Sequence, residues 1–415
     1  MNGPAGGESG GETVPSPPLR PAAFIALMCF LVSVGGYSVS LYLPSMPSIV
    51  AELDSTPAGV HLTLSVFMIS FGMAQLVWGP LSDRYGRRSM LGFGLGLYIA
   101  ASVGCSAAPT IEILIVFRAL QAIGACCAPV VARAVVRDVF ERDDMARVMS
   151  YVIGTFAVTG IVAPAFGATI HEAFGWRGNF AFMALAGTVL LITILAALPE
   201  THPASRRQAP STWRVIQNYR ILLCDRRHLG YAVSGSLSYS AYFIFSSVAA
   251  FVLIDVAGVS PMSFALYYAV VAIGYGTGTM TSAQLARRVG LDRTVVIGLV
   301  VSVLGSLIHN SLALAEMFGA NAIVLPMVIV AIGLGMVFPN LLSGAIAPFP
   351  AFAGAASSTS GFLQMLVSSV IGAIVLQFYD GTQLAMTAGI LFSVAAMAGV
   401  YYVLVWRRLN ATGSH

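Results

Sequence analysis

Hydrophobic positions run through this chain in long stretches of roughly 20 residues, separated by short polar connections. A helix rises 1.5 Å per residue, so about 20 residues cross the roughly 30 Å hydrocarbon core of a bilayer. The pattern therefore predicts an all-α membrane protein with twelve transmembrane helices. The predicted spans are 22–44, 58–80, 89–108, 110–132, 148–170, 178–198, 230–254, 263–285, 293–313, 321–345, 355–377 and 384–406.

Composition agrees with this prediction. Of the 415 residues, 57% are hydrophobic and only 9% are charged, and the mean hydropathy is +0.85. Soluble domains carry about 25% charged residues. An ordinary soluble protein is therefore excluded, and the lipid bilayer is the solvent for most of the surface.

The basic residues indicate how the chain is oriented. All of them are Arg, and 19 of the 21 fall on alternate connections, which lie on one side of the membrane. Only Arg177 lies on the other side, and Arg118 lies within a span. By the positive-inside rule, both termini are predicted to be cytoplasmic and the number of spans to be even. The net charge of +4 then reflects topology, and no nucleic-acid partner is expected.

The longest break between spans, 199–229, carries six Arg and is predicted to be a cytoplasmic linker on the membrane surface. It divides the chain into six spans plus six, the arrangement of transporters built from parallel repeats with a ligand site near the midplane. We therefore expect two pseudo-symmetric six-helix bundles. The predicted domains are a disordered cytoplasmic tail at 1–20, an N-terminal bundle at 21–198, the linker at 199–229, a C-terminal bundle at 230–406 and a cytoplasmic tail at 407–415.

The strongest local motif is GPLSDRYGRR at 79–88, on the short cytoplasmic connection after the second span. Glycine permits close helix approach and tight turns, while the acidic and basic residues can pair with each other. With the run RAVVRD at 133–138, this predicts a cytoplasmic conformational latch, in which Asp83, Arg87 and Asp138 take part. Its predicted members are Gly79, Asp83, Arg84, Gly86, Arg87, Arg88, Arg137 and Asp138.

The spacing GxxxDRxGRR resembles the signature loop of the major facilitator superfamily. Three more segments, YLPSMP at 42–47, RALQAIG at 118–124 and RAVVRD at 133–138, resemble its bicyclomycin and chloramphenicol resistance (Bcr/CflA-type) drug exporters. In the fifth span, Gly160, Pro164 and Gly167 resemble the antiporter motif of that branch. The resemblance implies a major facilitator fold and export of small molecules, with the proton gradient as energy source and no cofactor.

Arg118 is a functional candidate on physical grounds alone. It follows the outer end of its span by about eight residues, which places it about 12 Å into the membrane. A charge at that depth costs at least a few kcal/mol unless it faces a watery cavity or a partner. Gln121, one turn on, can share its hydrogen bonds. The alternative is a structural Arg satisfied by helix carbonyls and Gln121.

The sequence departs from the family at Ser40, where many members carry an Asp two residues before the Tyr of YLPxxP. No Asp or Glu lies near the middle of any predicted span. Proton antiport therefore stands beside a second possibility, facilitated export without proton coupling. With Arg118 as the only deep charge, neutral, zwitterionic or acidic substrates are favoured over obligate cations.

Polar and aromatic residues on single helix faces predict the lining of a substrate cavity. The full predicted substrate-binding set is Tyr37, Ser40, Arg118, Gln121, Tyr239, Tyr242, Phe243, Tyr268 and Tyr275. His61, His171 and His309 lie near the outer ends of spans and are interpreted as loop residues. The five Cys show no spacing typical of metal ligands, and no metal site is expected.

Taken together, these features predict a transporter in the inner (cytoplasmic) membrane of a bacterium that acts as a monomer and is not an enzyme. It would export a drug or a native secreted metabolite such as a siderophore. A receptor or sensor on the same scaffold is the second class considered, although the soluble signalling domain expected of it is not seen.

Overall fold

The computed structural model describes residues 20–140, 142–202 and 212–407. Within these ranges every regular element is a helix. The predicted tails at 1–20 and 407–415, apart from Arg20 and Arg407, lie outside the described residues, as does 203–211 of the predicted linker.

The first span of the N-terminal half changes from α-helix to 3₁₀-helix near its outer end. A 3₁₀ turn, η1, joins α1 to α2, as expected where Pro44 removes a backbone donor. Gly175 (φ 69°, ψ −179°) breaks α6 into two helical segments. The elements are α1 (Pro21–Ser40), η1 (Leu43–Ser45), α2 (Met46–Glu52), α3 (Pro57–Tyr85), α4 (Arg87–Ser106), α5 (Ile111–Val139) and α6 (Arg142–Ala197).

The C-terminal half follows a short helix, α7, that falls within the predicted linker. The elements are α7 (Thr212–Cys224), α8 (Arg226–Ala250), η3 (Phe251–Val256), α9 (Pro261–Val289), α10 (Leu291–Leu314), α11 (Ala320–Ile346), η4 (Pro350–Phe352), α12 (Ala353–Gln377), α13 (Leu384–Tyr401) and η5 (Tyr402–Trp406).

The prediction of twelve spans is confirmed. Ten described helices are long and apolar enough to cross a membrane, and one of them, α6, holds two spans on either side of Gly175. The twelfth is α9, 29 residues long, whose Tyr, Gly, Thr and Ser residues lower its hydropathy below that of the others.

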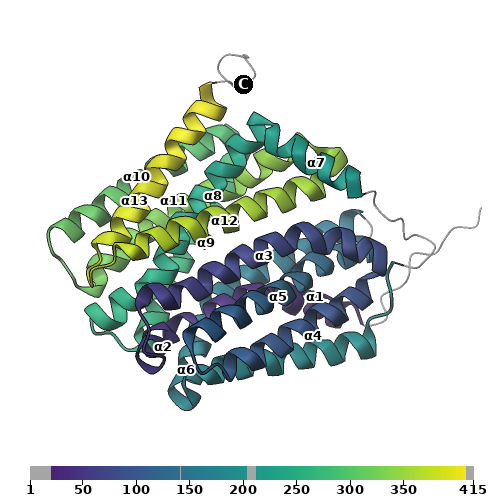
Figure 1. Cartoon of the computed structure of the whole chain (residues 1–415). Helices are drawn as coiled ribbons and strands as arrows, with labels where there is room; N and C mark the ends of the chain where they lie inside the picture. Colours follow the sequence, from purple (N-terminus) through teal and green to yellow (C-terminus); the bar gives the residue numbers. More distant parts are fainter. Residues whose placement is uncertain (1–19, 141, 203–211, 408–415) are drawn as a thin grey trace, which may run out of the picture.

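The spans form two bundles of six (Figure 1). The lower bundle consists of α1, α3, α4, α5 and the two segments of α6, and the upper bundle consists of α8 to α13. The bundles meet mainly through two helix pairs, α3 with α12 and α6 with α9. On the outer side, η1 and α2 also touch α8, η3 and α9. The space between the bundles is therefore bounded by a small number of helix contacts.

Two corresponding helices show that the halves repeat. Both α3 and α9 have 29 residues, a Pro in the first turn, and a hydroxyl N-cap, Thr56 and Ser260 respectively, whose side chain accepts from a backbone N–H three residues on. Both end at a glycine with positive φ, Gly86 at 94° and Gly290 at 90°. L side chains rarely adopt this conformation, so each glycine makes possible the tight cytoplasmic turn.

The helix α7 is fixed to the N-terminal bundle by one hydrogen bond. Pro80 lies inside α3 and lacks an N–H, so the carbonyl of Leu76, one turn earlier, loses its helical donor. The Tyr219 hydroxyl of α7 donates to that carbonyl at 2.9 Å. Burial raises the pKa of the Tyr219 hydroxyl, which keeps the donor protonated. Because α7 also packs on α12, it bridges the two bundles at the cytoplasmic side.

We expect Tyr219→Phe to lower the thermal stability of the purified protein, since the Leu76 carbonyl then has no donor, at a cost of about 1–2 kcal/mol. Tyr402→Phe is the matched control because Tyr402 is exposed in η5. Unfolding monitored by size-exclusion chromatography after heating measures both variants, and equal midpoints would contradict the assigned role of Tyr219.

Candidate functional site

Arg118 lies at the centre of the N-terminal bundle and is completely buried. Its Nη1 donates to the Ser38 carbonyl at 3.1 Å and to Gln121 Oε1 at 2.8 Å. The guanidinium also lies over the rings of Phe67 and Tyr42, 4.3 and 4.9 Å from their centroids. Carbonyl dipoles and aromatic faces thus stabilise the charge in place of a carboxylate.

Gln121 extends this network to neighbouring helices. Its Nε2 donates to Ser102 Oγ of α4 at 2.8 Å and lies 3.5 Å from Met183 Sδ of α6. The Arg118 atoms Nε and Nη2 have no hydrogen-bond partner among the described residues. The network therefore connects α1, α4, α5 and α6, and two donors of Arg118 remain unused.

The other predicted residues of α1 lie beside this network. Tyr37 is half-buried, and Ser40 is buried with 8% of its surface exposed. Neither Arg118 nor Gln121 exposes an atom to solvent in this conformation.

A tyrosine cluster in the C-terminal bundle brings together the predicted residues of α8 and α9. The Tyr242 ring lies 5.3 Å from Tyr275 and 6.3 Å from Tyr268, centroid to centroid. Tyr239 stacks on Phe243 at 6.5 Å. Aromatic rings with hydroxyl groups at their edges can hold an apolar ligand and orient its polar groups.

Sequence analysis missed one member of this cluster. Phe338 of α11 lies 6.4 Å from Tyr239. It precedes Pro339 and Asn340, and the Asn340 side chain donates to Ser282 Oγ of α9 at 2.7 Å. A polar and aromatic run next to a proline inside an apolar span was the available signal.

The interpretation of the histidines as loop residues is wrong. His61 lies in α3, His171 in α6 and His309 in α10, and His61 and His309 are each only 1% exposed. The His61 ring lies 5.8 Å from Phe243, so it reaches the C-terminal bundle. Position near the end of a span did not show that neighbouring helices cover these side chains.

At the cytoplasmic end, the structure brings Asp83, Arg87 and Asp138 together. Arg87 Nη1 lies 2.6 Å from Asp83 Oδ1, and its Nε donates to Asp138 Oδ2 at 3.0 Å. The backbone N–H of Arg87 donates to Glu200 Oε1 at 2.8 Å. One almost completely buried Arg thus joins α3, α4, α5 and the chain segment after α6.

The remaining predicted members of the latch differ in their surroundings. Arg88 donates to the Leu195 carbonyl, Arg84 lies over the Tyr85 ring at 5.1 Å, and Arg137 is exposed. The expected close approach at Gly79 does not occur, because a Cβ there would meet no atom within 4 Å.

The three residues that resemble an antiporter motif also have different surroundings. A Cβ on Gly167 would overlap the Leu41 carbonyl, so α6 touches the end of α1 there, and Pro164 is buried close by. Gly160 makes no such contact. Of the two glycines, Gly167 packs tightly against a neighbouring helix and Gly160 does not.

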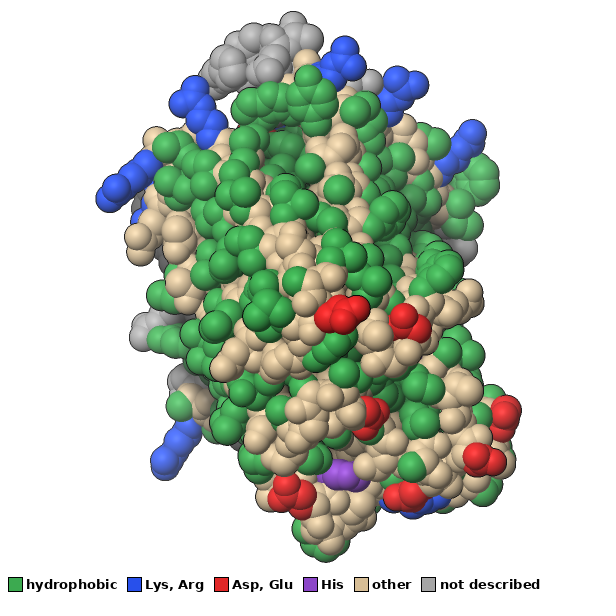
Figure 2. Space-filling view, turned by 90° about the vertical axis from the view of Figure 1, so that its left-hand side faces the viewer, with side chains coloured by type: hydrophobic (Ala, Val, Ile, Leu, Met, Phe, Trp, Pro, Cys, Tyr) green, Lys and Arg blue, Asp and Glu red, His purple; other side chains and the backbone are tan. Residues whose placement is uncertain are grey.

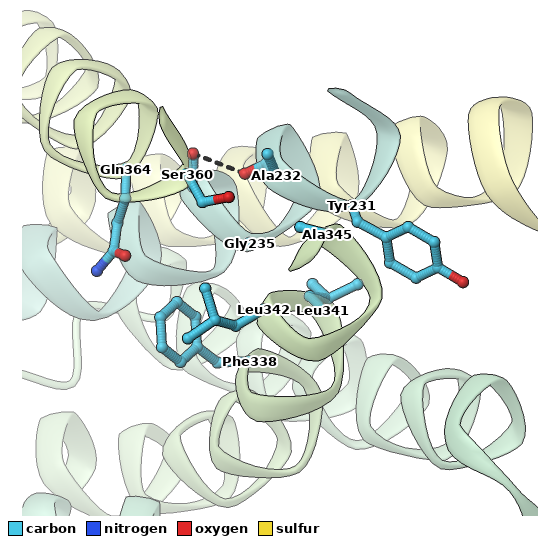
Figure 3. Close-up of a pocket in the computed structure, with 10 residues that line it drawn as sticks. Tyr231, Ala232, Gly235, Phe338, Leu341, Leu342, Ala345, Ser360 and Gln364 are labelled. Carbon is cyan, nitrogen blue, oxygen red and sulfur yellow. Dashed lines mark hydrogen bonds between the residues drawn. The ribbon is translucent and has the colours of Figure 1, made fainter. Parts of the chain in front are cut away.

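Figure 3 shows a hollow between α8, α11 and α12, lined among others by Tyr231, Phe338 and Gln364. Its volume is only about 10 Å³, close to the least that holds one water molecule. Sites for drug-sized ligands enclose about 300–1,000 Å³. This hollow is therefore too small for such a ligand in the present conformation.

Comparison with known proteins relates this architecture to transporters. A family profile described as Major Facilitator Superfamily matches residues 28–374. The multidrug resistance protein MdtL of Escherichia coli O45:K1 is 31% identical over 84% of this chain and 86% of its own length. The bicyclomycin resistance protein homolog of Haemophilus influenzae is 26% identical over 94% of this chain and 98% of its own.

Solved structures give the same fold. A peptide transporter (POT) in complex with sulfate superposes with a TM-score of 0.75 at 15% identity, covering 94% of this chain and 96% of that one. A D-xylose-proton symporter superposes with a TM-score of 0.72 at 16% identity, covering 91% and 97%.

The contact at Gly167 predicts a difference between two chemically identical changes. Gly167→Val places methyl groups against the Leu41 backbone and should destabilise the protein by about 1–3 kcal/mol. Gly160→Val in the same helix adds the same side chain where no atom obstructs a Cβ. Thermal unfolding of the two purified variants compares them, and an equal loss of stability would argue against the α1–α6 contact.

Proposed function

Since the chain belongs to the Major Facilitator Superfamily, we propose that it exports small organic molecules from the bacterial cytoplasm by alternating access of its two bundles. The observation that carries the proposal is its similarity, over 84–94% of the chain, to proteins named for multidrug and bicyclomycin resistance. The cargo is a drug or a secreted metabolite such as a siderophore.

The contacts between the bundles support a rocking motion. Each bundle has its own internal network, around Arg118 in one and around the tyrosine cluster in the other. Few helix pairs join the two, chiefly α3 with α12 and α6 with α9. A motion that changes these contacts leaves the hydrogen bonds inside each bundle intact.

The chemistry of the buried residues favours neutral, zwitterionic or acidic cargo. Arg118 keeps two unused donors, and the tyrosines add rings and hydroxyl groups. We assign substrate contacts to Tyr239, Tyr242 and Tyr275 first. A quaternary ammonium ion would meet the repulsion of Arg118 and find no deep carboxylate as counter-ion.

Coupling to the proton gradient is the finer part of the proposal. The resemblance to drug exporters implies proton antiport, but Ser40 stands where many of those exporters carry an Asp, and a hydroxyl does not titrate near neutral pH. The alternative is facilitated export without proton coupling. His61 is buried, and histidine is a residue type whose free side chain titrates near neutral pH, so it is a candidate for proton binding.

The orientation follows from the charges at the two ends. The acidic residues Glu52, Asp54, Glu112, Glu316 and Asp380 are exposed at the ends assigned to the outside. Figure 2 looks onto that face and shows acidic side chains over its lower half and Arg mostly at its edges. We therefore assign the protein to the cytoplasmic membrane with both termini in the cytoplasm. We also propose that the segment 199–229 is the linker between the bundles and that the functional unit is a monomer.

The direct test measures transport in proteoliposomes carrying a pH gradient, with chloramphenicol and bicyclomycin as neutral probes and ethidium as a cationic probe. The proposal expects movement of at least one neutral probe that depends on the protein, and little movement of ethidium. Proton flux recorded in the same vesicles separates antiport from facilitated export. Ethidium transport without transport of either neutral probe would contradict the proposed substrate class.

The ion pairs of Arg87 predict the behaviour of Asp83→Asn. Arg87 keeps Asp138 and Ser82 as partners, and the Asp83 side chain is 45% exposed, so insertion and stability should be nearly unchanged. Transport should fall several-fold because the latch loses one of its two carboxylates. Asp380→Asn makes the same chemical change at an exposed outer position and serves as control. Full transport activity in Asp83→Asn would eliminate the latch.

A further inference from the structure

His61 touches both bundles at the outer side of the molecule. Its Nε2 lies 3.1 Å from Ser247 Oγ of α8, and its Nδ1 lies 3.2 Å from Ser65 Oγ of its own helix, α3. A Cβ on Gly372 of α12 would lie 3.1 Å from the ring. One imidazole thus holds the outer ends of α3, α8 and α12 together.

The hydrogen bonds assign the protonation state of this ring. The Ser247 hydroxyl donates to the Phe243 carbonyl at 2.8 Å, and we assign the Nε2–H tautomer to His61 because Nε2 then donates to the oxygen whose own proton is used. Nδ1 is then the acceptor, and the Ser65 hydroxyl donates to it. The closed interface therefore holds a neutral imidazole with both nitrogens satisfied.

A second proton on His61 does not suit this interface. A proton on Nδ1 would occupy the position at which the Ser65 hydroxyl now donates. The Ser65 hydroxyl would then have to donate to the Ser369 carbonyl, 3.5 Å away. The proton on Nδ1 would also place a positive charge among Phe243, Gly372 and two serine hydroxyls. Burying such an unpaired charge is unfavourable, and hydration of the ring in the open form removes that penalty.

No charged group of the described residues compensates that charge. The charged groups of α3 and α8, namely Asp83, Arg84, Arg226, Arg227 and His228, lie at the cytoplasmic ends of those helices, away from His61. Tyr239 and Tyr242 of α8 belong to the tyrosine cluster. At the outer side, Glu52 of α2 pairs with Arg177, and Asp54, Asp255, Tyr379 and Asp380 lie on the neighbouring connections. Tyr379 packs on Phe251, and Asp380 accepts from Thr382. Within the described chain, no ion pair joins a carboxylate to His61.

Water can approach His61 from outside. A hollow of about 260 Å³ lies at the outer ends of α3 and α12, and His61 lines it together with Ala58, Leu62 and Gln377. This volume has room for several water molecules. A small separation of α3 from α8 and α12 would admit that water to the imidazole, which is then free to exchange the Ser65 contact of Nδ1 for water.

We propose that His61 binds a proton from the outer compartment and that this proton holds the outer ends of the two bundles apart. The proton passes from external water to Nδ1 as the interface opens, and returns to that water when it closes. Acid outside therefore favours the outward-open form. The inference deepens the proposed export function, on which it rests, by giving external protons a site without a carboxylate at position 40.

The test measures the distance between the outer ends of the bundles as a function of pH. Spin labels replace Phe174 of α6 and Met317 after α10, both exposed, in a full-length chain whose native cysteines are substituted. Electron–electron resonance in lipid nanodiscs without substrate should show a longer distance gaining population from pH 8 to pH 5. For one proton, the ratio of open to closed forms changes up to tenfold per pH unit.

Three variants make the test specific. His61→Gln, which keeps a donor and an acceptor but cannot take up a proton, should stay closed at every pH. His309→Gln removes another buried histidine of the outer half and should keep the wild-type response. Ser247→Ala weakens only the closed form, so it should move the midpoint to higher pH. It also reports on His61 if His61→Gln does not insert.

A distance that does not vary with pH in the unmodified His61 protein would overturn the proposal, as would an unchanged response in His61→Gln. Because no substrate is needed, the result is separate from the export assay. Export with a pH-independent outer distance removes only the role of His61, whereas pH-dependent opening without any export removes only the proposed function.

Discussion

The absence of water inside the bilayer is the constraint on which this structure depends. Backbone polar groups within the hydrocarbon must find their partners in the protein, since no water is there to replace them. Serine and threonine hydroxyls meet the requirement locally, as Ser240 does by donating to the Ser236 carbonyl one turn back. Where Pro80 leaves the Leu76 carbonyl unpaired, Tyr219 supplies the donor from another helix. Hydrogen bonds within and between helices thus satisfy polar groups that the bilayer cannot.

Motion is left to the contacts between the bundles, which are made by small residues. A Cβ on Gly72 of α3 would lie 3.0 Å from Met365 of α12, and one on Gly361 would meet the Gln75 amide. Along this helix pair, the described residues form no ion pair. Such a surface can shift without separating charges, while His61 supplies a specific polar contact between the bundles at the outer end. The ion pairs of Arg87 at the cytoplasmic end lie within the N-terminal half.

The sequence was sufficient for the fold because the bilayer sets the length and polarity of each helix directly. The proximity of Asp83, Arg87 and Asp138 could be predicted because two local motifs, at 79–88 and 133–138, place them at the cytoplasmic ends of neighbouring helices. Their role as a latch stays a prediction. The burial of the histidines could not be predicted, because that of His61 depends on how α3 is rotated toward α8 and α12. In the same way, the ring partners of Arg118 come from helices far apart in sequence, and Gly160 was expected to pack as closely as Gly167 but does not.

The claim that the bundles rock about a central site is tested most directly by fixing them together. Ser65 and Ser247 bond to opposite nitrogens of one imidazole, so cysteines at these positions lie within reach of a short bifunctional thiol reagent. With a neutral probe that the untreated double variant transports, cross-linking should abolish transport and cleavage of the linker should restore it, while each single variant remains active after treatment. Transport that continues in the cross-linked protein would contradict the alternating-access account.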